Sequence, residues 1–128
     1  MTSVPTRWRS AVRDQLDNAL QRVARAEEYL EAGHGGRAMQ ETYPAVIAGA
    51  TIRVWLDLPP WLQVLSADEM RRQIQERLPS LFAAITEIDV QQVLTSPWRV
   101  TDARPYVREA TAYVQQTEVQ VTAWLEDT

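Results

Sequence analysis

The single histidine, His34, lies in "LEAGHGGRAMQE", residues 30–41. Histidine titrates near neutral pH and is a common metal ligand, so His34 is the first candidate for acid–base chemistry or metal binding. A metal site in a helical bundle uses Glu-x-x-His on one helix together with further inward-facing glutamates. Glu31 and His34 have that spacing, but glycines interrupt the helix there, and the expected inner faces of the other helices carry almost no carboxylate. We predict no metal site and a solvated turn histidine near a helix C-terminus.

The string "GHGGR" combines several backbone amides with the start of a helix, an arrangement that can hold an anion. His34, Gly35, Gly36 and Arg37 are therefore candidate anion-binding residues, and a plain turn is the alternative interpretation. The chain has no cysteine, which excludes disulfides, thiolate zinc sites and cysteine nucleophiles. It also has no Walker, dinucleotide-binding or nucleophile-elbow motif, and we predict no cofactor.

The elements that position these residues read as helices. Apolar residues recur at steps of three and four over residues 6–32, and Gly33 is expected to end that helix in the left-handed conformation. A second helix is expected over residues 37–58, where Pro44 either bends it or divides it and Pro59-Pro60 ends it. Ser66 with Glu69 forms a predicted capping box for a third helix.

Helical spacing is interrupted at Pro79, resumes to about residue 94, and returns for a last helix over residues 103–126. No stretch shows the period-two alternation of a strand. A length of 128 residues suits one domain, residues 1–128. We predict an all-α, up-and-down bundle of four to five helices with two long antiparallel helix pairs.

Four aromatic and apolar residues fall outside the apolar stripes of the expected helices. Trp61 and Trp98 lie in proline-flanked connectors, where they either cap the ends of the bundle or form an apolar patch for a partner. Tyr113 and Val119 fall off the main apolar stripe of the last helix. All four are candidate partner-interface residues.

The order of segments resembles a known family. Residues 19–56, "ALQRVARAEEYLEAGHGGRAMQETYPAVIAGATIRVWL", resemble the first helix pair of HEPN (higher eukaryotes and prokaryotes nucleotide-binding) domains. Residues 96–126, "SPWRVTDARPYVREATAYVQQTEVQVTAWLE", are similar to the family's ending, in which an arginine-bearing loop precedes a long final helix. The ribonucleases of the family carry Arg, four to six residues, then His at this point. Arg99 is suitably placed, but Arg104, Pro105 and Tyr106 follow where the histidine is expected.

The missing histidine favours a non-enzymatic module. The resemblance then implies a likeness to non-catalytic relatives, which form homodimers and act beside a small nucleotidyltransferase as substrate-binding or antitoxin-type partners. Two alternatives remain open. One is a small-molecule or nucleotide sensor that binds an anion through Arg37 and the glycine amides. The other is a divergent ribonuclease that uses Arg99 and Tyr106, with Arg104 holding phosphate.

Charge and hydropathy bear on partners and location. The net charge of −4 and the pI of about 5.0 provide no overall positive field for nucleic acid, so nucleic acid is not the expected partner, although it is not excluded. The N-terminus has no apolar core of a signal peptide. The longest weakly polar run is far shorter than the roughly 20 residues of a membrane-spanning helix. We expect a cytoplasmic protein without membrane contact.

Overall fold

The structure is a computed structural model that describes residues 4–85 and 87–127. The described residues form helices and no strand, which confirms the all-α class. The helices are α1 (Thr6–Glu31), α2 (Gly35–Asp57), α3 (Ala67–Glu76), α4 (Ser80–Ala83), α5 (Glu87–Thr95) and α6 (Val100–Asp127). None of these described helices is both long and apolar enough to cross a bilayer.

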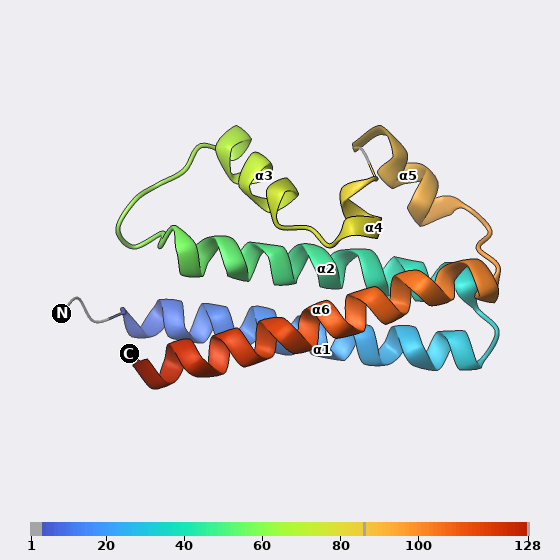
Figure 1. The fold of residues 1–128 in the computed structure, drawn as a ribbon, viewed down its shortest axis with the longest axis horizontal. Coiled ribbons are helices and arrows are strands. Elements are labelled where there is room, and N and C mark those ends of the chain that lie inside the picture. The colour runs from blue at the N-terminus through green and yellow to red at the C-terminus, as the bar shows by residue number, and fades with distance from the viewer. Residues whose placement is uncertain (1–3, 86, 128) are drawn as a thin grey trace.

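The three long helices α1, α2 and α6 lie side by side as a bundle, and the short helices α3, α4 and α5 lie along one side of α2 (Figure 1). The arrangement therefore differs from the expected two long antiparallel pairs. The segment between α2 and α6 is divided into helices of 10, 4 and 9 residues. Pro79, which precedes α4, separates the first two of these because proline restricts the residue before it and lacks an N–H for the helix.

The turn between α1 and α2 is a Schellman motif built on Gly33. This glycine has a φ of 84°, and its N–H donates to the Leu30 carbonyl at 3.0 Å. The His34 N–H donates to the Tyr29 carbonyl at 2.8 Å. These two bonds satisfy carbonyls that the helix end leaves open, and glycine enters the left-handed region without the steric cost of a Cβ. The predicted left-handed end of the first helix is confirmed.

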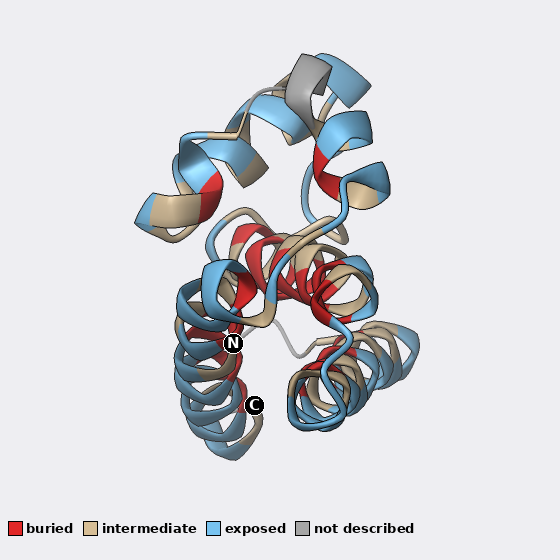
Figure 2. Cartoon of the chain, turned by 90° about the vertical axis from the view of Figure 1, so that its right-hand side faces the viewer, coloured by how far each residue is buried: buried red, intermediate tan, exposed pale blue. Residues whose placement is uncertain are grey.

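Helix α2 is the centre of the fold because its buried residues are not confined to one narrow stripe. Figure 2 shows buried positions gathered on α2, between the α1–α6 layer and the short helices. Pro44 lies inside α2 without dividing it, which settles the question that the sequence left open. The buried residues of α2 are Gly35, Ala38, Met39, Thr42, Ala45, Val46, Ala48, Gly49, Ala50, Ile52 and Val54.

A helix cap, an ion pair and a buried aromatic ring fix the short helices in place. The Ser66 side chain accepts a hydrogen bond from the Glu69 N–H at 3.1 Å, so the predicted N-cap of α3 is confirmed. At the other end of α3, Arg77 forms an ion pair with Asp57 of α2 at 3.0 Å. Phe82 of α4 is completely buried and anchors this layer in the core.

Candidate functional site

The predicted anion-binding turn is packed against the start of α6. Gly35 is buried, and a Cβ added there would lie 2.5 Å from the Trp98 carbonyl oxygen and 3.0 Å from the Arg99 carbonyl carbon. The backbone of this turn therefore touches the backbone of the Trp98–Arg99 segment, as only glycine allows. His34 is exposed and lies edge-on to the Tyr29 ring, 6.5 Å between centroids.

The candidate residues of the turn and of α6 do not converge on one centre. The Arg37 guanidinium lies over the Tyr29 ring at 6.0 Å. Arg104 and Tyr106 are two residues apart on α6, which turns about 100° per residue, so their side chains project from nearly opposite faces. Arg104 and Tyr106, which the predicted ribonuclease site would combine, therefore do not face one another.

Tyr106 belongs to a row of aromatic side chains. Its ring is 5.5 Å from that of Phe82 and 5.3 Å from that of Trp98, and both contacts are edge-to-face. The Trp98 indole N–H donates to the Val93 carbonyl at 2.7 Å. Trp98 is therefore half-buried as a cap on this end of the bundle, and Tyr106 has a packing role that accounts for its position.

Tyr113 corrects one prediction of the sequence. The sequence pattern predicts a partner-interface residue, but Tyr113 is only 6% exposed and lies between α6, α2 and the end of α3. Its hydroxyl donates to the Arg77 carbonyl at 2.8 Å, and the Arg53 guanidinium lies 3.9 Å from the ring centroid. Burial raises the pKa of the Tyr113 hydroxyl, and the nearby Arg53 and Arg77 oppose that rise. The sequence pattern does not predict this burial because it comes from the packing of α6 against α2 and the end of α3, which is a tertiary feature.

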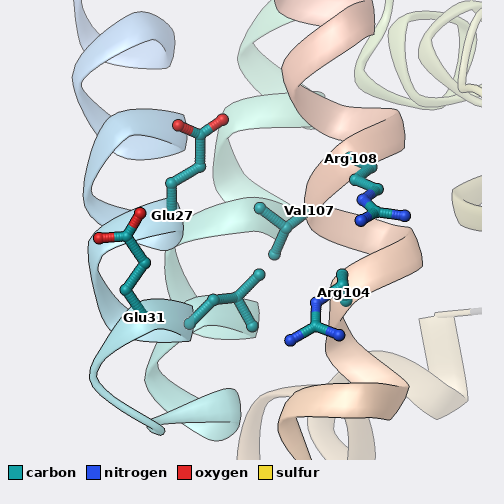
Figure 3. Close-up of a pocket in the computed structure, with 6 residues that line it drawn as sticks. Glu27, Glu31, Arg104, Val107 and Arg108 are labelled. Carbon is teal, nitrogen blue, oxygen red and sulfur yellow. The ribbon is translucent and has the colours of Figure 1, made fainter.

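A charged hollow separates the last turns of α1 from the first turns of α6. It has a volume of about 280 Å³ and contains Arg104, the candidate anion-binding residue, with Glu27 and Glu31 on the opposite helix. In Figure 3 the carboxylates project from α1, Arg104 reaches toward α1, and Arg108 lies over α6. Leu30 and Val107 form an apolar floor between the two helices.

The opposite end of the molecule carries an aromatic cluster, here called the tryptophan end: Trp8, Trp55, Trp61 and Trp124. Ring centroids are 5.5 Å apart for Trp8 and Trp55, and 6.0 and 6.1 Å from Trp61 to Trp8 and Trp124. Trp61 is half-buried in this cluster, so it caps the bundle end. The four residues come from α1, α2, the connector and α6, which places the start of α1 and the end of α6 near this end (Figure 1).

An apolar hollow adjoins the tryptophan end. Its volume is about 340 Å³, and it is lined by Trp8, Trp55, Leu58, Pro60, Gln63, Val64, Leu65 and Met70, none of which is ionisable. Leu62 and Val64, in the same connector, are 62% and 94% exposed. The sequence pattern places Trp61 in this proline-flanked connector but does not single out Leu62 or Val64. The signal was present in "PPWLQVLS", an apolar run between a helix-ending proline pair and a helix cap.

Among the described residues, no group of three or more His, Asp or Glu side chains is placed to hold a metal ion. The third large apolar side chain exposed in the described part of the chain is Val119, 69% exposed on the outer face of α6.

No protein-family model, curated protein or solved structure matches the chain.

Proposed function

We propose that this chain is a non-enzymatic helical interaction module that binds a separate protein through the apolar hollow at the tryptophan end. The observation that carries the proposal is the exposure of Leu62 and Val64 to water beside an uncharged hollow. Apolar side chains exposed beside an apolar hollow cost free energy in water, and larger exposed apolar patches mark contact surfaces. Interface cores are likewise depleted of charged residues and enriched in aromatic residues, especially tryptophan.

The resemblance to non-catalytic HEPN domains names the class of partner to test first, a small nucleotidyltransferase. In this proposal, Leu62 and Val64 enter an apolar pocket of the partner, while the hollow receives an apolar side chain from it. The rigid Trp8 and Trp55 rings in the wall of the hollow lose little conformational freedom on binding, which favours affinity.

A capture experiment tests this surface. The tagged protein is isolated from its host with and without nuclease treatment, next to the variant L62D/V64D. Both substitutions are at exposed positions, so the fold is retained, but each one places a carboxylate in the proposed contact, where desolvation penalises it. We expect a stoichiometric protein partner that survives nuclease and is lost from L62D/V64D.

The matched control is V119D, which makes the same kind of change on the outer face of α6. V119D is expected to retain the partner. Equal capture by the wild type and L62D/V64D would contradict the proposed surface. Recovery of RNA that disappears after nuclease treatment, with no protein partner, would contradict the interaction module itself.

We propose also that the chain forms a homodimer, as the resemblance implies, through the outer face of α6. Val119 lies there in a shallow groove with Thr122 and Ala123, between Glu118 and Glu126. Sedimentation equilibrium over a range of concentrations is expected to give twice the chain mass for the wild type and for L62D/V64D, and the monomer mass for V119D. A wild type that stays monomeric at the highest concentration would refute the dimer.

A further inference from the structure

The hollow between α1 and α6 has an arrangement of charge that the interaction function does not use. Glu27 and Glu31 are one turn apart near the C-terminus of α1, and Arg104 and Arg108 are one turn apart near the N-terminus of α6. Glu31 is the last residue of α1, at a helix C-terminus, where the helix dipole disfavours a carboxylate.

The opposed charges are also not neutralised by direct ion pairs. Among the described residues, no carboxylate lies within 4.0 Å of the Arg104 or Arg108 guanidinium groups. Elsewhere between the long helices, facing charges are in contact, as Arg22 is with Glu41 at 3.4 Å. In the hollow, by contrast, Glu27 accepts a hydrogen bond from Thr111 at 3.1 Å, which orients its carboxylate without occupying it fully.

We propose that this hollow binds a small zwitterion of the amino acid class, with its carboxylate on Arg104 and its ammonium group on Glu27 and Glu31. The charge distribution selects this class, because the glutamates repel a simple anion and the arginines repel a simple cation. A guanidinium binds a carboxylate through two parallel hydrogen bonds, and a carboxylate is the matching acceptor for an ammonium group. The volume of about 280 Å³ lies just below the range of drug-sized pockets, which fits a ligand of a few heavy atoms.

The floor of the hollow adds a preference among zwitterions. Leu30 and Val107 lie between the charged rows, and Val107 is almost completely buried. Methylene groups between the two charges of a ligand would cover this apolar floor, as in the ω-amino acids. The site is open to solvent, so salt screens its charges and affinity should fall as ionic strength rises.

Titrations followed by ¹H–¹⁵N spectra test the site directly. The probes are glycine, β-alanine and γ-aminobutyrate, with acetate and methylammonium as singly charged controls at equal ionic strength. We expect saturable shifts, with dissociation constants in the millimolar range, in the amides of residues 27–31 and 104–108 for at least one zwitterion. Neither singly charged control should saturate these amides.

Variants that replace a charged side chain with glutamine distinguish binding at this site from a general effect of surface charge. R104Q and E31Q are each expected to weaken binding about tenfold or more, as the loss of one charge-assisted hydrogen bond implies. E28Q makes the same change in net charge as E31Q at an exposed position of α1 outside the hollow, and should change affinity less than about twofold. Absence of saturable shifts for all three zwitterions would overturn the proposal, as would equal shifts from acetate. These outcomes leave partner capture through Leu62 and Val64 untouched, so the two proposals fail separately.

Discussion

Replacing Gly35 with alanine is expected to lower the free energy of unfolding by about 3 kcal/mol, near the upper end of typical overpacking costs. The added Cβ would lie 2.5 Å from the Trp98 carbonyl oxygen, a separation that real Cβ atoms do not adopt. The obstructing atoms belong to the backbone, so no side-chain rotation can relieve the overlap. The turn must separate from the start of α6, which disturbs two long helices at once.

The neighbouring glycine provides the control. A Cβ at Gly36 would lie 3.7 Å from the Ser96 carbonyl oxygen, an ordinary contact, and Gly36 also lies in the first turn of α2. Alanine there should be neutral or stabilising by up to about 1 kcal/mol, because alanine loses less backbone entropy than glycine in a helix. Urea unfolding followed by far-UV circular dichroism measures both variants. Equal stabilities for the two would show that the close approach of the turn to Trp98 is absent.

Replacing Tyr113 with alanine is expected to cost about 3–5 kcal/mol, the usual range for truncating a buried aromatic side chain. The ring fills the space beside Gly49, where a Cβ would meet the Tyr113 ring at 2.9 Å. The truncation would also remove the surface on which the Arg53 guanidinium lies and the donor to the Arg77 carbonyl. Helices α2, α3 and α6 would all lose contacts.

Tyr113→Phe separates the contribution of the ring to stability from that of the hydroxyl. It keeps the packing and loses the 2.8 Å hydrogen bond to Arg77, so we expect a cost of about 1–2 kcal/mol. Thermal and urea unfolding of both variants, with partner capture measured alongside, distinguishes a core role from an interface role. A Tyr113→Ala protein with wild-type stability and lost partner binding would restore the original interface prediction and contradict the buried position.

Local features of the fold were predictable from the sequence because they depend on neighbouring residues. Gly33 ends α1 because a left-handed residue is needed there, and Ser66 begins α3 because its hydroxyl accepts a backbone N–H. The Pro59-Pro60 pair similarly follows the end of α2. In each case the residue that sets the helix end lies within a few positions of it in the sequence.

Tertiary features were not predictable in this way. The spacing of apolar residues predicts that α3 is amphipathic but not that it lies beside Tyr113 of α6. The tryptophan end joins residues 8, 55, 61 and 124, which no local pattern connects. Arg104 was identified as a candidate site residue, but its opposition to Glu27 and Glu31 depends on how α1 and α6 pack.

The most direct test of the interaction module is hydrogen exchange of the chain, free and bound to the captured partner. Among the described residues, the backbone N–H groups of Val64 and Leu65 have no backbone acceptor, so they exchange rapidly in the free protein. The proposed function predicts that exchange over residues 58–65 slows in the complex, while exchange around Val119 keeps its free rate apart from effects of dimer formation. Protection confined to another surface, with residues 58–65 unchanged, would contradict the proposal that the tryptophan end is where the partner binds.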